Sequence, residues 1–152
     1  MKITVVLRND HEALKELFNK FKKPAAARNQ NEKREVFNEI RREILMHSQI
    51  EHEIFYPALS ATTSTRAAEL VATAEQEHRE VEELLQELHG MSGSDKSFET
   101  KMSSLMDDVS KHIDMEEEEM FDEARKNLPE FRLEELGIEM EDRRRILSTL
   151  AA

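Results

Sequence analysis

Residues 36–56, VFNEIRREILMHSQIEHEIFY, decide the fold. The apolar residues of this stretch recur at spacings of three and four, which predicts a helix with one face toward a core. His47 and Glu51 stand in that face, at positions where the pattern calls for leucine or valine. Residues four apart lie one above the other on a helix. The stretch therefore predicts a core helix that presents an imidazole and a carboxylate to one buried point.

Three other segments carry a similar apolar stripe with ionisable residues in it. The first segment places His11 in its stripe, the third places His78, and the fourth places His112 and Glu116. A single polar residue in such a stripe can be a rim position or a satisfied core histidine. Six of them need a common partner, because burying unpaired carboxylates is costly. We interpret the six as a metal site.

The two halves of the chain resemble each other. The segment 10–17 parallels 77–84, and the His-x-x-x-Glu pair at 47–51 parallels the pair at 112–116. Each half is then a helical hairpin with a lone histidine on its first helix and His-x-x-x-Glu on its second. Two such hairpins pack as an up-down-up-down bundle.

The predicted fold class is all-α: an up-down-up-down four-helix bundle with a short additional C-terminal helix. Gly and Pro number only three each, which favours long helices. Breaks between helices are expected at 24–31, 57–65, 90–94 and 127–129. We expect one domain over 1–152, with the four-helix core at about 3–127 and the C-terminal helix at about 132–149.

Composition excludes several classes of function. The chain has 152 residues, a net charge of −11 and no cysteine. Disulfides, zinc–thiolate sites, iron–sulfur clusters and cysteine nucleophiles are therefore excluded. The negative charge disfavours nucleic acid and anionic membrane surfaces as partners. No apolar run is long enough to span a membrane and no signal-peptide core is present, so we expect a cytoplasmic protein.

Imidazole and carboxylate ligands without sulfur suit iron, manganese, zinc or similar ions. A carboxylate has two oxygens and can bridge two neighbouring metals, whereas one histidine nitrogen cannot. We therefore expect Glu51 and Glu116 to bridge. The expected terminal ligands are His11, His47, His78 and His112. No catalytic side chain or organic-cofactor motif is identified apart from this site.

This ordered set of residues resembles the hemerythrin-like family, also called the HHE cation-binding domain. The resemblance is carried by Asn9-Asp10-His11-Glu12, His47 to Glu51 running into Phe55-Tyr56-Pro57, Glu77-His78, His112 to Glu116, and the tail Leu133 to Gly137. It implies a non-haem centre of two iron ions, with an oxo or hydroxo bridge, that meets oxygen or nitric oxide. Other divalent metals are compatible with the same ligands.

The sequence departs from the oxygen-carrying hemerythrins at two points. Those proteins have His-x-x-x-His in the third helix, whereas the earlier position is Ala74 here. They also place an aspartate five residues after the last histidine, whereas Glu116 lies at four and Glu117 at five. We expect one metal to have fewer protein ligands and an open or water-filled position. These departures argue against simple reversible oxygen transport, and they leave Glu117 as the alternative to Glu116.

Several residues near the motifs have plainer interpretations. His52 points about 100° away from Glu51 on a helix, so we expect a supporting or surface role. His89 precedes Gly90 in a last helical turn and is interpreted as structural. Tyr56 is interpreted as a core-edge residue, with a role at the metals as the alternative. Glu77 is expected to face solvent.

The leading functional hypothesis is a protein that binds oxygen or nitric oxide, or reports iron, through two iron ions. The rival is a di-iron oxidase or an enzyme that consumes peroxide on the same site. A metal-free helical interaction module is the third possibility. A sensor would need a separate protein partner.

Overall fold

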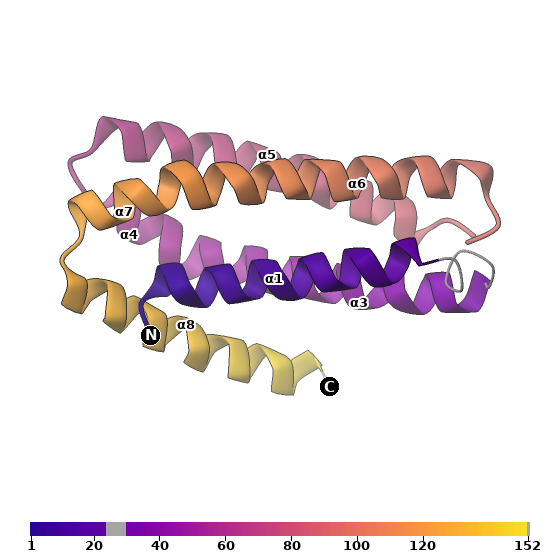
Figure 1. Cartoon of the computed structure of the whole chain (residues 1–152), viewed down its shortest axis with the longest axis horizontal. Helices are drawn as coiled ribbons and strands as arrows, with labels where there is room; N and C mark the ends of the chain where they lie inside the picture. Colours follow the sequence, from indigo (N-terminus) through magenta and orange to yellow (C-terminus); the bar gives the residue numbers. More distant parts are fainter. Residues whose placement is uncertain (24–29, 152) are drawn as a thin grey trace.

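The computed structural model describes residues 1–23 and 30–151, and almost all of this part is helical (Figure 1). Most of the first expected break, at 24–31, lies outside the described residues. The helices are α1 (Ile3–Lys22), α3 (Gln30–Ile50), α4 (Tyr56–Ser60), α5 (Thr65–His89), α6 (Lys96–Met115), α7 (Phe121–Asn127) and α8 (Glu130–Ala151), with π-helical turns η1 (Glu51–Phe55) and η2 (Glu116–Met120).

Two of the bundle helices are continuous rods with a π turn inside them. One runs through α3, η1 and α4, and the other through α6, η2 and α7. The break expected at 57–65 therefore begins later than predicted, after Ser60. Pro57 does not end the rod; it stands directly after the π turn, as the second residue of α4.

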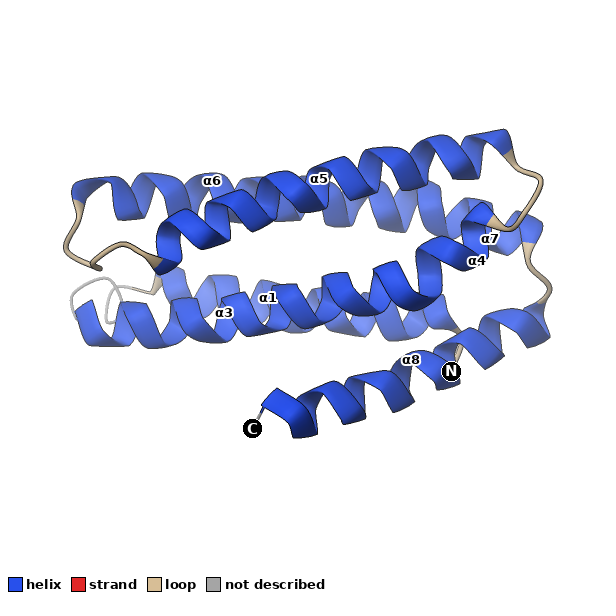
Figure 2. Ribbon diagram, turned by 180° about the vertical axis from the view of Figure 1, so that it is seen from behind, coloured by secondary structure: helices blue, strands red, loops and turns tan. Residues whose placement is uncertain are grey.

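The four rods form a bundle in two layers, with α1 against α3 and α5 against α6 (Figures 1 and 2). The expected break at 90–94 is present: α5 ends at His89 and α6 begins after its N-cap Asp95, whose carboxylate accepts a hydrogen bond from the Ser97 N–H. The predicted fold class, a four-helix bundle with an additional C-terminal helix, is confirmed.

The core consists of two apolar clusters, separated along the bundle by the ionisable residues of the stripes. One cluster includes Phe55, Tyr56 and Phe121, and the other includes Phe37 and Phe98. Full burial of each such aromatic side chain stabilises the fold by roughly 2 to 3 kcal/mol. The two clusters thus hold the polar layer between them.

The C-terminal helix α8 is longer than expected, at 22 residues, and lies along the outside of α1 and α3 (Figure 2). Its buried residues Leu133, Leu136 and Met140 complete the cluster that contains Tyr56. No helix among residues 1–23 and 30–151 is long and apolar enough to cross a membrane.

Candidate metal centre

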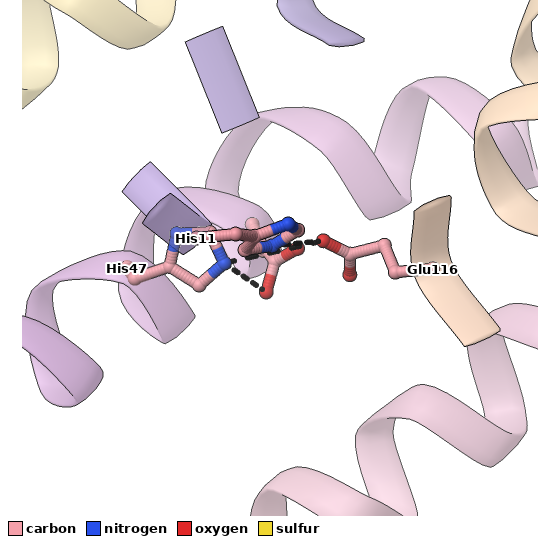
Figure 3. Close-up of side chains that lie close together, drawn as sticks. His11, His47 and Glu116 are labelled. Carbon is pink, nitrogen blue, oxygen red and sulfur yellow. Dashed lines mark ion pairs between the residues drawn. The ribbon is translucent and has the colours of Figure 1, made fainter. Parts of the chain in front are cut away.

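The six ionisable residues of the stripes converge at mid-bundle. His11 comes from α1, His47 from the end of α3 and His78 from α5, while His112 lies near the end of α6 and the glutamates open the two π turns. None of the six is more than 5% exposed. Figure 3 shows His11, His47 and Glu116 pointing toward one another.

One group of four residues could hold a first ion. The ligand atoms of His11, His47, Glu51 and Glu116 all lie within 4.8 Å of one another. His11 Nε2 is 3.0 Å from Glu116 Oε1, and His47 Nε2 is 3.2 Å from Glu51 Oε1. Two donors at right angles around one ion, each about 2.1 Å from it, are about 3 Å apart. The spacing therefore fits a shared cation.

A second group, Glu51 with His78 and His112, lies beside the first. His78 Nε2 is 3.2 Å from Glu51 Oε1, and His112 Nε2 is 3.3 Å from Glu116 Oε2. Glu51 thus belongs to both groups, and Glu116 turns one oxygen to each. Glu116 is thus placed as a two-oxygen bridge would be, whereas Glu51 faces both groups through the single oxygen Oε1. Glu117 lies outside both groups.

Five buried atoms of these residues form no hydrogen bond of regular geometry in the described part of the chain, although four of them face one another as the pairs His11–Glu116 and His47–Glu51. They are Nε2 of His11, Nε2 of His47, both carboxylate oxygens of Glu51, and Oε1 of Glu116. Buried polar atoms are almost always paired, since an unpaired one is costly. Their convergence on one region fits bound cations.

Every one of the four histidines has its other ring nitrogen, Nδ1, tied to a neighbour. His47 Nδ1 is 3.1 Å from Asp10 Oδ2, and His112 Nδ1 is 3.2 Å from Glu77 Oε1. The two acids occupy equivalent positions, each immediately before the lone histidine of its own hairpin. A fixed Nδ1–H orients the ring and leaves the Nε2 lone pair toward the metal. Glu77 is 30% exposed, as expected of a solvent-facing residue, and it also supports a histidine.

The two lone histidines are supported from the opposite hairpin. His11 Nδ1 is 2.7 Å from Glu117 Oε2, and His78 Nδ1 is 3.2 Å from His52 Nε2. Glu117 and His52 each follow a shared glutamate by one residue. The supporting role expected for His52 matches this geometry, while the exposed His89 lies in the last turn of α5, as expected.

The sequence model of the hemerythrin HHE cation binding domain matches residues 2–124. The chain belongs to this family. A solved structure titled as a hemerythrin HHE cation binding domain-containing protein from Mycobacterium kansasii has a TM-score of 0.85 to this HHE domain at 30% identity, covering 99% of this chain and 90% of that one. Fold and family membership predicted from the motifs are thereby confirmed.

A curated relative of this HHE domain carries a different name. A DNA nickase from Nostoc sp. (strain PCC 7120) is 25% identical over 139 residues, which are 91% of this chain and 38% of the nickase. This chain therefore spans well under half the length of that relative.

Tyr56 is a site residue that the sequence interpretation did not favour. It is 2% exposed, and its hydroxyl donates to Glu116 Oε2 at 3.0 Å and lies 3.2 Å from His78 Nε2. Its side chain packs in the apolar cluster while its hydroxyl reaches the proposed ligands, as in the alternative interpretation of this residue. Ala74 is fully buried in the same apolar cluster as Tyr56. The internal repeat contained a signal for this position, because Tyr56 follows Glu51 by five residues just as Phe121 follows Glu116.

The π turn explains how Tyr56 reaches the site. In a regular α-helix a residue five positions after Glu51 would lie about 140° around the axis from it. The Tyr56 N–H instead donates to the Glu51 carbonyl, five residues back, which brings the tyrosine under the glutamate. Phe121 has the same relation to Glu116 and stacks on the His11 ring, with ring centroids 6.1 Å apart.

The charges of the centre shift several pKa values. Burial alone would lower the pKa of His47, but Glu51, Asp10 and Glu116 together raise it to about 10. The pKa of His112 is likewise raised well above its usual value, against burial, chiefly by hydrogen bonding to Glu116 and Glu51. Burial and both shared glutamates raise the pKa of Tyr56, which stays a phenol in the metal-free protein. Without metal, protons on the histidines offset the buried carboxylates.

A small cavity of about 20 Å³ lies against the centre. Three imidazoles, of His47, His78 and His112, form its polar edge. Its remaining lining is Leu14, Ile44, Ser48, Val81, Val109 and Ile113. This volume can hold one water-sized molecule. The cavity offers a mostly apolar place for a small molecule next to the metal ligands.

Proposed function

We propose that this HHE domain binds two iron ions and that the centre binds oxygen or nitric oxide. The observation that carries the proposal is the sharing of Glu51 and Glu116 between two sets of buried histidines. The proposed ligands are His11, His47, Glu51, His78, His112 and Glu116, and Tyr56 is proposed as an additional group at the second position.

Two adjacent iron ions, when bound, supply Lewis acidity and reversible one-electron chemistry to a small ligand. The chain would hold them with imidazole Nε2 atoms and carboxylates whose positions are set by Asp10, Glu77, Glu117 and His52. The cavity edged by His47, His78 and His112 would receive the small ligand, and its aliphatic lining would limit water.

Metal analysis with an optical spectrum of protein made in iron-replete cells tests the metal claim. About two iron ions per chain are expected in the wild type and in the matched control His89→Ala, which removes an exposed histidine. His112→Ala should lose at least one ion. Fewer than one metal per chain in the wild type, with His112→Ala no different, would overturn the proposal.

Exposure of the reduced iron protein to nitric oxide and then to oxygen tests the ligand. A spectral change with either gas at constant iron content supports gas binding. An unchanged spectrum with both gases excludes it and leaves iron reporting as the remaining form of the binding hypothesis. In that form, a separate protein partner would read the metal state.

The second candidate function is consumption of peroxide, favoured by the position of Tyr56. A phenol oxygen 3.0 Å from Glu116 can stabilise ferric iron or carry an oxidising equivalent, which disfavours reversible oxygen carriage. Sustained loss of hydrogen peroxide at substoichiometric protein, abolished in His47→Ala, would favour this candidate. One equivalent consumed without turnover would reject it.

We propose no nucleic-acid partner, despite the similarity to a DNA nickase. The net charge of −11 repels a phosphate backbone, and this chain matches 38% of that relative. Retarded migration of a DNA duplex at 50 mM salt, or nicking of a supercoiled plasmid, would contradict this.

A further inference from the structure

The helix α8 lies entirely beyond residues 2–124, the part matched by the family. It is nevertheless firmly packed on α1 and α3 (Figure 2). Leu133, Leu136 and Met140 are buried, and Gly137 lies so close to the chain start that a Cβ there would be 1.9 Å from the Met1 carbonyl oxygen. The helix α8, which follows the part of the chain matched by the family, is therefore packed as an integral part of the fold.

One residue of α8 connects to a proposed metal ligand. Arg144 donates through one terminal nitrogen to Asp10 Oδ2 at 3.1 Å and through the other to Glu43 Oε2 at 2.7 Å. The same Asp10 oxygen is 3.1 Å from His47 Nδ1. Asp10 is 7% exposed, so these partners, more than water, hold its carboxylate oxygens. An unbroken chain of polar contacts runs from α8 through Asp10 to His47.

The second hairpin has no such connection. Glu77 holds His112 just as Asp10 holds His47, but no arginine or lysine pairs with Glu77 in the described residues. Its side chain is 30% exposed, and it lines a small surface pocket with Glu80, Asp108 and Lys111. Solvent therefore supports Glu77, whereas α8 supports Asp10. The two metal positions differ in this respect.

We propose that Arg144 is a positioning residue for the metal centre and that α8 thereby controls how tightly the His11–His47 position retains its ion. This inference rests on the proposed metal binding. Arg144 keeps the Asp10 carboxylate against His47 Nδ1, and the oriented ring keeps its Nε2 toward the ion. Without the guanidinium, the carboxylate can turn toward water and the imidazole loses its fixed orientation.

The neighbouring Arg143 offers a matched control. It also joins α8 to the bundle, through bonds of 2.7 and 3.1 Å to the two oxygens of Glu53. Both partners are over one third exposed, and Glu53 contacts no proposed ligand. Arg143→Gln therefore removes the same charge from the same helix and breaks one contact between α8 and the bundle. It leaves the contacts from Arg144 through Asp10 to His47 unchanged.

The experiment measures metal release from the purified metal-loaded protein to excess chelator. Arg144→Gln should release one of two ions about 10- to 100-fold faster than the wild type, the usual effect of losing an outer partner of a metal ligand. Arg143→Gln should stay within about twofold, by the weak contribution of exposed pairs. Asp10→Asn should resemble Arg144→Gln, and the double variant should be no faster than either, because both act on one path.

A purely structural role predicts different results. Equal acceleration in Arg143→Gln and Arg144→Gln, or wild-type release in Arg144→Gln, would overturn the inference. If Arg144→Gln does not fold, Arg144→Lys decides: a lysine cannot reach Asp10 and Glu43 together as the planar fork does, so release should still be faster. Wild-type protein that holds no metal would overturn the proposed function itself. Metal that is held equally well by every variant would overturn only the role of Arg144.

Discussion

The Tyr56 hydroxyl donates a 3.0 Å hydrogen bond to Glu116 Oε2, across the interface between the two hairpins. The Tyr56 hydroxyl oxygen also lies 3.2 Å from His78 Nε2 and 3.4 Å from His112 Nε2. A phenol therefore lies among the atoms of the candidate second metal position. The two halves of the repeat differ here, because the residue equivalent to Tyr56 is Phe121.

Tyr56→Phe should retain both ions, since the six imidazole and carboxylate ligands remain. The ferric protein should lose any visible absorption band that arises from charge transfer between phenolate and iron. The metal-free protein should lose about 1 kcal/mol of unfolding free energy with the hydrogen bond. Metal analysis, optical spectra and denaturant unfolding check these three points. A spectrum identical to that of the wild type would show that the phenol does not bind iron.

Glu51→Gln should affect both metal positions, because Glu51 Oε1 lies 3.2 Å from His47 Nε2 and from His78 Nε2. We expect the metal content to fall to one ion per chain or fewer. The metal-free protein should also lose about 3 kcal/mol, because a charged imidazole is left without its buried partner. Glu75→Gln, a partly exposed residue off the site, should keep both ions. Loss of only one ion, with the other bound at full strength, would contradict a bridging Glu51.

The pH dependence should differ between metal-free and metal-bound protein. The pKa of His47 is raised from 6.5 to about 10 in the fold, so its contribution to stability is complete below pH 6.5 and is lost as pH rises toward 10. The pKa of Glu51 is lowered well below 4.5, against burial, mainly by the charge of His47, so its contribution is present above pH 4.5 and lost in acid. Metal-free protein should thus be most stable between these limits.

Metal affinity should rise over the same range in which metal-free stability falls, because each ion must displace protons from His47 and His112. Unfolding free energies with and without metal should therefore diverge from pH 6 to pH 9. Proton release on metal binding should be detectable in weak buffer at pH 7. Parallel pH curves, or no proton release, would contradict this assignment of protons.

Val109→Ile should reduce the 20 Å³ cavity beside His47, His78 and His112. If the cavity receives nitric oxide, the rate of binding should fall about tenfold, which corresponds to about 1.4 kcal/mol. The control Val36→Ile adds the same methylene to a buried valine of the same core cluster that does not line the cavity. Stopped-flow spectra at matched iron content measure both. Equal binding rates in the two variants would show that nitric oxide does not bind through this cavity.

Gly137→Ala should weaken the docking of α8, because the new Cβ would meet the Met1 carbonyl oxygen at 1.9 Å and the Ile3 backbone nitrogen at 3.0 Å. The expected loss is about 1 to 3 kcal/mol of unfolding free energy. Gly90→Ala is the matched control, since its nearest neighbour would be 3.7 Å away and no positive φ is involved. The effect there should stay within about 0.5 kcal/mol. Similar unfolding free energies for both variants would contradict the close approach.

The helical period was enough to predict the bundle and the convergence of its polar residues. A stripe with spacings of three and four specifies which face is buried, so His47 and Glu51 had to point into the core together. Burial of a charge without a partner is costly, so the other four residues had to meet them. These conclusions depend on the geometry of a single helix and on the cost of burying an unpaired charge, and both can be judged from the sequence.

Tertiary structure alone decided the features that depend on contacts between helices. The π turn brings Tyr56 under Glu51, although five residues of a regular helix would carry it away. Asp10 is paired with Arg144, whereas the equivalent Glu77 faces solvent, because α8 packs on α1 and α3 and not on α5 and α6. No periodicity within a helix encodes which neighbour it receives. The sequence therefore determined which ionisable residues meet at mid-bundle, and the packing of the helices against one another determined what supports each of them.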